Sequence, residues 1–156
     1  MNFVDITKAR VLDLASDFIA IDDPHVQAGM LEKWDRSNYL FDLPNKWTLS
    51  KMVTEDGQLL GYRVVSGVGK LPDFCHSHRT SIRSGYQKLG LGRKLLNLAI
   101  IDARKLGYAG MTGLCDPENH TSKKFLSATG WDFLSCIKGG NELWSLDFRV
   151  VREDRI

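Results

Sequence analysis

A glycine-rich turn in the middle of the chain constrains the fold more than any other feature of the sequence. Residues 84–92 read SGYQKLGLG. The preceding residues, 74–82, favour a strand, and residues 91–106 favour a long helix that ends before Gly107. A strand that passes through such a turn into a helix leaves backbone N–H groups open where the helix dipole favours a phosphate. The sequence therefore predicts an α/β fold with an anion-binding turn.

Hydrophobic periodicity and turn residues place the other elements of the fold. We expect helices at 9–21 and 23–34, strands at 47–54, 59–68 and 109–115, a helix after Asn119 that ends at Thr129, and a hairpin at 131–137 and 143–150. The strands before the turn follow one another closely and are expected to be antiparallel. The strand–helix–strand segment in the middle implies at least one parallel pair. The expected class is thus α/β (α+β), with one mixed sheet that is mostly antiparallel.

Length and composition indicate a single domain, 1–156. The chain has 156 residues, of which 43% are hydrophobic and 26% charged, as in ordinary globular proteins. A net charge of +2 is too small to indicate nucleic-acid binding, and no apolar run reaches the length of a membrane span. Asp5, Asp13 and Asp17 interrupt the first apolar stretch, unlike a signal peptide, and three cysteines suit a reducing compartment. We expect a cytoplasmic protein that binds neither nucleic acid nor membrane.

Charge is distributed unevenly along the chain. Residues 1–60 hold ten acidic and six basic side chains, whereas residues 61–156 hold nine and fifteen. This asymmetry is consistent with a cationic partner for the first segment and an anionic partner for the second. An ordinary scatter of solvated charges is an equally good interpretation.

Two common phosphate-binding motifs do not fit the turn. A Walker loop requires Lys and then Ser or Thr after its last glycine, but Leu91 follows Gly90 and Arg93 follows Gly92. The dinucleotide-binding fingerprint requires a third glycine where Leu95 stands. The remaining pattern is Gln87-x-x-Gly90-x-Gly92 after a strand and before a helix.

This pattern resembles the signature of the GNAT superfamily of acyl-CoA-dependent N-acyltransferases. An aliphatic Ile82 ends the strand, and Tyr86 precedes the glutamine, as in that family. Asn119 lies eleven residues before Gly130-Trp131, which matches the family's Asn and closing Gly-aromatic pair. From residue 47 to residue 148, the order of elements is also similar.

The resemblance implies a GNAT-like fold, in which the strand 74–82 and the next strand form a splayed parallel pair flanked by helices. It implies acetyl-CoA as the donor substrate. Backbone N–H groups of residues 88–93 would bind the pyrophosphate, and the backbone of residues 80–82 would pair with the pantetheine arm as an extra strand. Asn119 would bind the pantetheine or the nearby chain. The implied donor-binding residues are Thr80, Ser81, Ile82, Gln87, Lys88, Leu89, Gly90, Leu91, Gly92, Arg93 and Asn119.

The chain departs from the family at the usual acid and base. Many members use a Glu on the fifth strand and a Tyr in the following helix, but these positions hold Leu114 and Leu126, which cannot transfer a proton. His76 and His78 are the substitute that we expect to be catalytic. Histidine titrates near neutral pH and can accept the proton of an attacking ammonium. The alternative is that both are packed residues without a role in catalysis.

The position of the two histidines is also found in related families. Arylalkylamine N-acetyltransferases carry a His-x-His at the same distance before the signature, and histone-type acetyltransferases have their base Glu at the place of His76. Alternation along a regular strand would put His76, His78, Thr80 and Ile82 on one face.

The function implied by the resemblance is transfer of an acetyl group from acetyl-CoA to a primary amine of a small molecule, by direct attack in a ternary complex. Cys and His spacings typical of a metal site are missing, so we expect no metal. One alternative is a protein N-terminal or lysine acetyltransferase. The other is a non-catalytic acyl-CoA-binding sensor, which the missing Glu and Tyr suggest. We expect a monomer or a homodimer.

Overall fold

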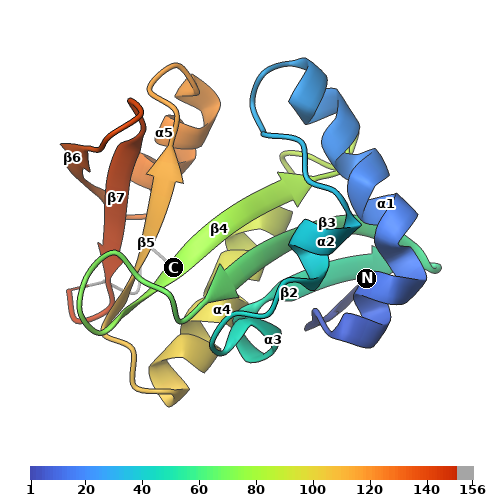
Figure 1. Cartoon of the computed structure of the whole chain (residues 1–156), viewed down its shortest axis with the longest axis horizontal. Helices are drawn as coiled ribbons and strands as arrows, with labels where there is room; N and C mark the ends of the chain where they lie inside the picture. Colours follow the sequence, from blue (N-terminus) through green and yellow to red (C-terminus); the bar gives the residue numbers. More distant parts are fainter. Residues whose placement is uncertain (151–156) are drawn as a thin grey trace.

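The computed structural model describes residues 1–150 and contains a seven-stranded sheet in the order β1-β2-β3-β4-β5-β7-β6 (Figure 1). The strands are β1 (Asn2–Asp5), β2 (Lys51–Glu55), β3 (Gln58–Ser66), β4 (Phe74–Ile82), β5 (Gly110–Cys115), β6 (Asp132–Cys136) and β7 (Glu142–Asp147). The helices are α1 (Lys8–Gln27), α2 (Arg36–Leu40), α3 (Lys46–Leu49), α4 (Leu91–Lys105) and α5 (His120–Ala128). β4 and β5 are parallel, and the other neighbouring strands are antiparallel. The predicted fold class is confirmed.

Helices cover both faces of the sheet (Figure 1). On one face, Phe18 of α1 and Tyr39 of α2 are buried together with Tyr62 of β3. On the other face, Leu95 of α4 is buried together with Leu60. Burial of these apolar surfaces is the main force that holds the helices to the sheet. Within residues 1–150, no helix combines the length and the apolar character that a bilayer span requires.

The first helix differs from its prediction. Instead of separate helices at 9–21 and 23–34, α1 runs from Lys8 to Gln27 with a kink at Leu14, where φ is -118° and ψ is 17°, and no helix is found at 28–35. Asp22 lies at the expected boundary, but its carboxylate is buried and accepts hydrogen bonds from other elements. These tertiary contacts hold the helix intact through Pro24, which reads locally as the start of a new one.

The segment 47–54 also differs from its prediction as a single strand. Lys46–Leu49 form α3, and β2 begins only at Lys51. The buried Lys46 ammonium donates to the backbone carbonyls of Tyr39, at 2.7 Å, and Phe41, at 2.6 Å, which ties α3 to the end of α2. β1 was not predicted, because its four residues are too few for a periodic pattern. The predicted strand 74–82 is confirmed, and the helix 91–106 is confirmed except for its last residue.

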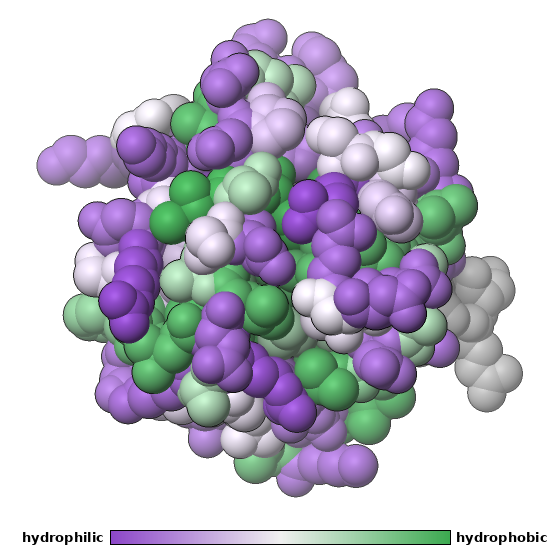
Figure 2. All heavy atoms as spheres, turned by 90° about the vertical axis from the view of Figure 1, so that its right-hand side faces the viewer, coloured by the Kyte–Doolittle hydropathy of each residue, from purple (hydrophilic) through white to green (hydrophobic). Residues whose placement is uncertain are grey.

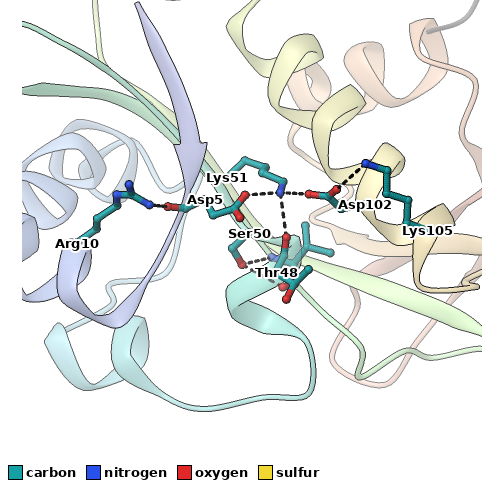
Figure 3. A network of polar contacts seen from close by, with 8 residues as sticks. Asp5, Arg10, Thr48, Ser50, Lys51, Asp102 and Lys105 are labelled. Atoms are coloured by element: carbon teal, nitrogen blue, oxygen red, sulfur yellow. Dashed lines mark hydrogen bonds and ion pairs between the residues drawn. The ribbon is translucent and has the colours of Figure 1, made fainter.

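A buried lysine connects three elements beneath α4 (Figure 3). The Lys51 side chain is only 5% exposed, and its ammonium lies 2.5 Å from Asp5 of β1. It also contacts the carboxylate of Asp102 on α4 and donates to the backbone carbonyl of Thr48, at 2.9 Å. Three acceptors on three elements therefore satisfy the three N–H groups of one ammonium. The short edge strand β1 and the helix α4 are thus both tied to β2.

We predict that Lys51→Met destabilises the protein by about 1 to 3 kcal/mol, because the two carboxylates lose their shared counter-charge. The loss stays below that of a fully buried pair, since the Asp5 and Asp102 side chains are 50% and 28% exposed. Lys105→Met is the matched control, because Lys105 lies 4.0 Å from Asp102 and is 74% exposed. Urea unfolding at two salt concentrations measures both variants. An equal loss for the two would contradict the central position of Lys51.

Candidate functional site

The parallel strands β4 and β5 are paired at their first residues only and then diverge in the middle of the sheet. Their pairing runs from Phe74 opposite Gly110 to Ser77 opposite Gly113 and ends there. Beyond this point β4 continues to Ile82 and pairs only with β3, while β5 pairs only with β7. The strands therefore form a fork, and one edge of β4 is open from residue 78 to residue 82.

The register of β3 and β4 shows which backbone groups point into the fork. The N–H of Arg83 donates to the Leu60 carbonyl, at 2.7 Å, next to the opposed pair Gly61 and Ile82. In an antiparallel ladder, hydrogen-bonded and non-hydrogen-bonded pairs alternate. The N–H and C=O of Ile82 therefore point away from β3, toward the open edge, and the same holds for Thr80 two residues earlier. These are backbone groups that a bound extended chain can use.

The glycine-rich turn lies at the far end of β4 and leads into α4. Gly90 is the N-cap of α4, with a left-handed φ of 79°, and no side chain caps the helix. The first helical bond runs from the N–H of Lys94 to the Gly90 carbonyl, at 3.0 Å. The N–H groups of residues 91–93 are therefore open to a ligand, as the sequence predicts. Lys88, also with positive φ at 66°, is exposed beside them.

Gly92 occupies the first turn of α4 and faces α5. A Cβ at this position would lie 3.8 Å from the ring of Phe125, which is ordinary contact. A Cβ at Gly90 would meet no atom within 4 Å, so the space beside this glycine is open. The predicted phosphate cradle thus lies between the start of α4 and α5. The side chains of Gln87, Leu89 and Arg93 are exposed around it.

Asn119 has a structural role in addition to the predicted one. Its side-chain oxygen accepts the N–H of Ser122, at 3.1 Å, and caps α5. An N-cap of this kind stabilises a helix by about 1 kcal/mol. Its amide NH₂ donates no hydrogen bond within the described part of the chain.

The two predicted catalytic histidines lie side by side at the fork. Their ring centroids are 4.8 Å apart. A β-bulge follows at His78: Val64 pairs with Arg79 and Val65 with Ser77, so that His78 is the extra residue of β4. The bulge reverses the alternation of side chains along the strand. Beyond it, Arg79 contacts α1, whereas Ile82 packs toward α4.

The expectation that Thr80 and Ile82 share a face with the histidines is therefore wrong. Thr80 is opposite Arg63, whose guanidinium donates to Ser77 on the side away from α1, at 2.9 Å. A bulge adds one residue to a strand, and the sequence around it carries no clear sign of this. An alternation of side chains with a period of two, continued past the bulge, therefore assigns the later residues to the wrong face of the sheet. The backbone of Thr80 and Ile82 still lines the open edge.

Each histidine has a hydroxyl partner. His76 Nδ1 lies 2.7 Å from the hydroxyl of Thr112, its neighbour on β5, and that hydroxyl donates to the Cys75 carbonyl, at 3.3 Å. Since a hydroxyl has one proton, Nδ1 of neutral His76 is the donor to Thr112, and Nε2 is left as the basic nitrogen. His78 Nε2 lies 2.6 Å from the hydroxyl of Ser66.

Burial keeps both imidazoles neutral. Burial, more than the charges of His78 and Lys70, lowers the pKa of His76 to about 3. Burial, followed by the charges of Lys46 and Lys70, lowers the pKa of His78 to about 4. At neutral pH both rings are therefore unprotonated. Their low pKa makes them weak bases, so that a proton placed on either is released easily.

A buried polar cluster next to the histidines was missed in the sequence. Arg79 donates to the Asp22 carboxylate, at 3.1 Å, and to the hydroxyl of Tyr62, at 3.1 Å. It also donates to the backbone carbonyl of Glu32 and lies over the ring of Trp34, at 4.6 Å from the centroid. This cluster fastens the segment 28–35 over β4. The sequence offered one sign of this cluster, the charged Arg79 inside the predicted strand 74–82.

Five of the ten acidic residues of the first sixty, Asp5, Asp22, Asp35, Asp42 and Glu55, make side-chain contacts within the fold. Asp22 is buried against Arg79, and Asp35 caps α2. Asp42 pairs with Lys8, at 2.7 Å, and accepts from the Trp47 indole, at 2.8 Å. The expectation of a cationic partner for this segment therefore rests on the other five carboxylates, which make no side-chain hydrogen bond or ion pair within the described part of the chain. Leu114 is exposed on β5, and Leu126 packs against the core, so neither position offers a proton donor.

A hollow of about 500 Å³ beside β1 does not belong to this site. It is lined by residues of β1 and α1, among them Phe3, Arg10 and Leu14, and β1 lies three strands from β4. On this side of the molecule, apolar and polar side chains are interspersed (Figure 2). Among the described residues, no three His, Cys, Asp or Glu side chains gather as a metal site.

Comparison with known proteins gives consistent results. The profile of the family described as "Acetyltransferase (GNAT) family" matches residues 12–131. The ribosomal-protein-S18-alanine N-acetyltransferase of Escherichia coli is similar in structure, with a TM-score of 0.74 at 15% identity over 98% of this chain and 97% of that one. PaiA N-acetyltransferase of Thermoplasma acidophilum, solved in complex with coenzyme A, gives 0.73 at 14% identity, over 94% and 98%. No curated protein sequence matches the chain significantly.

A third similar structure is larger than this chain. N-acetylglutamate synthase of Neisseria gonorrhoeae, complexed with coenzyme A and N-acetyl-glutamate, gives a TM-score of 0.72 at 17% identity, over 94% of this chain and 34% of that one. Identities this low establish a shared fold and leave the acceptor open.

We predict that stability falls with acid between pH ~6.5 and pH ~4, the window between the unfolded pKa of histidine and the lowered values of the buried pair. In this window the unfolded chain binds protons that the folded protein does not, so the free energy of unfolding decreases by at most about 1.4 kcal/mol per pH unit for each histidine. Urea unfolding across this range measures the slope. His76→Gln with His78→Gln should flatten it, whereas His120→Gln, at an exposed histidine, should not. An unchanged slope in the double variant would show that the rings are protonated in the fold.

Proposed function

Because the chain belongs to the acetyltransferase (GNAT) family, we propose that it transfers an acetyl group from acetyl-CoA to a primary amine of a small molecule. The family resemblance that the motif around Gly90 indicated is thereby confirmed. The observation that carries the donor assignment is the continuity of the fork with the open start of α4. The fork would hold the extended pantetheine arm of coenzyme A along β4, and the start of α4 would offer three backbone N–H groups to the phosphates of coenzyme A.

The donor would lie along this path in three parts. The pantetheine arm would pair with the N–H and C=O groups of Thr80 and Ile82, as a short extra strand. The pyrophosphate would accept the N–H groups of residues 91–93, with Lys88 and Arg93 as nearby cations. The thioester would then reach the point where β4 and β5 diverge, next to His76 and His78.

The reaction at this point is nucleophilic acyl transfer. The amine nitrogen attacks the thioester carbonyl carbon, a C–N bond forms, and the C–S bond breaks with coenzyme A as the leaving thiolate. The attacking nitrogen loses one proton, for which Nε2 of His76 is the free basic position. Since its pKa of about 3 is low, the ring relays the proton to water or to the thiolate and does not keep it.

The leucines at 114 and 126 favour a second candidate, an acyl-CoA-binding sensor without catalysis. The usual acid and base of the family are not available at these positions. Release of free thiol from acetyl-CoA in the presence of a panel of amines separates the two. The panel should include polyamines, amino sugars, arylalkylamines, amino acids, and peptides with a free N-terminus or lysine, so that a protein substrate is also detected. Thiol release with none of them, despite tight donor binding, would favour the sensor.

The cradle assignment leads to a prediction at Gly92. Gly92→Asp should abolish binding of coenzyme A, because its carboxylate would stand among the N–H groups that serve the pyrophosphate and would repel it. The variant should fold, since a Cβ there has room beside Phe125. Gly92→Ala is the control and should retain most of the affinity. Calorimetry with coenzyme A measures both, and tight binding by a folded Gly92→Asp variant would rule out this cradle.

The proton path leads to a prediction at His76. His76→Gln keeps a hydrogen-bonding side chain without a base, and turnover should fall about 10- to 100-fold, since water can partly substitute. Affinity for coenzyme A should not change, and the rate of the variant should rise with pH as more free amine is present. Steady-state kinetics of one accepted amine between pH 6 and 9, roughly, provides the test. A wild-type rate with a wild-type pH profile in both His76→Gln and His78→Gln would make the histidines structural.

A further inference from the structure

A third histidine, on α1, reaches the open edge of β4. His25 lies near the end of α1, and its Nε2 is 2.8 Å from the backbone carbonyl oxygen of Ile82. The side chain is half-buried, and its partner is 57 residues away in the sequence. This carbonyl is one of the groups that the register directs into the fork. The bond therefore places an imidazole at the edge along which a donor would lie.

The Ile82 carbonyl can accept a hydrogen bond from a ligand in addition to the one from His25. His25 belongs to α1, which packs on one face of the sheet (Figure 1). An extended arm paired with β4 would approach in the plane of the sheet. A carbonyl oxygen has two lone pairs and accepts two hydrogen bonds. His25 and a bound arm can therefore share the Ile82 carbonyl as neighbours.

The position of His25 is firmly held. Asp22 lies one helical turn earlier, on the same side of α1, and is fixed by its buried ion pair with Arg79 of β4. The Arg79 guanidinium also holds the Glu32 carbonyl, on the segment that follows the helix. The end of α1 is thus anchored on both sides of His25, so that little conformational entropy remains to be lost on binding.

The bond also defines the proton position on the ring. A carbonyl can only accept, so Nε2 of His25 carries the proton, and Nδ1 of the neutral ring has a free lone pair. The bond to Ile82 is the one hydrogen bond of this ring within the described part of the chain. Nδ1 is thus an unused acceptor beside the fork, and pantetheine offers two amide N–H groups and a hydroxyl as donors.

We propose that His25 is a donor-binding residue, which flanks the pantetheine arm at Ile82 and contributes to its affinity. This inference rests on the proposed function, because it takes acyl-CoA as the ligand of the fork. It assigns to α1 a direct part in holding the donor, next to the turn that holds the phosphates.

The test compares ligands that contain different parts of coenzyme A, on the full chain. His25→Ala should weaken coenzyme A and 4′-phosphopantetheine about fivefold each, the loss expected for one hydrogen bond with its packing. Adenosine 3′,5′-bisphosphate, which lacks the arm, should bind within about twofold of wild type. His25→Gln, which can still donate to Ile82, should recover part of the loss. Gln27→Ala, at an exposed neighbour on α1, is the control and should change nothing. Calorimetry measures affinities, and thermal unfolding verifies that each variant folds.

Each other outcome contradicts the inference in its own way. Unchanged or tighter binding of coenzyme A by folded His25→Ala would mean that His25 is a bystander or a competitor of the arm. An equal loss for adenosine 3′,5′-bisphosphate would place its effect at the phosphates or in the fold as a whole. If the wild-type protein binds neither coenzyme A nor its fragments, the proposed function itself fails, and this result is distinct from the other two.

Discussion

The ion pair between Asp22 and Arg79 is the contact on which the arrangement of the site depends. Both side chains are almost completely withdrawn from water, and tyrosine hydroxyls together with a backbone carbonyl complete their hydrogen bonds. Removal of one partner would leave the other charged and buried, which typically costs about 3–5 kcal/mol. The pair therefore fixes the register of α1 on β4, and with it the placement of His25 and of the segment 28–35.

The second constraint is the parting of β4 and β5. A sheet whose strands stayed paired would have no free backbone groups at its centre, and the start of α4 would face a closed edge. The fork opens β4 toward a ligand at the same end at which the glycine-rich turn exposes its N–H groups. An extended arm and a phosphate can then be bound by one strand–turn–helix unit, largely through backbone atoms. Because backbone atoms would make most of these contacts, few of the side chains along β4 and the glycine-rich turn need to be buried or charged.

The acceptor side is organised by side chains. The bulge at His78 brings Arg79 to the face of β4 that carries the two histidines, where burial keeps the imidazoles neutral and the guanidinium holds the neighbouring segment. Because leucines stand at the usual acid and base positions, we assign the proton transfer to this histidine pair. Neutral, buried imidazoles of low pKa suit the transient relay of a proton better than its storage.

The sequence by itself determined the class of fold, the strand 74–82, the helix that follows the turn, and the anion-binding character of the turn. These features depend on local rules, because glycine conformation, helix ends and hydrophobic periodicity act over a few residues. Only the tertiary structure decided that α1 continues through Pro24, that the bulge turns Thr80 and Ile82 away from the face of the histidines, and that His25 meets Ile82. Each of these depends on contacts between residues far apart in the chain, such as Asp22 with Arg79, whose burial energy exceeds the local preference that it overrides.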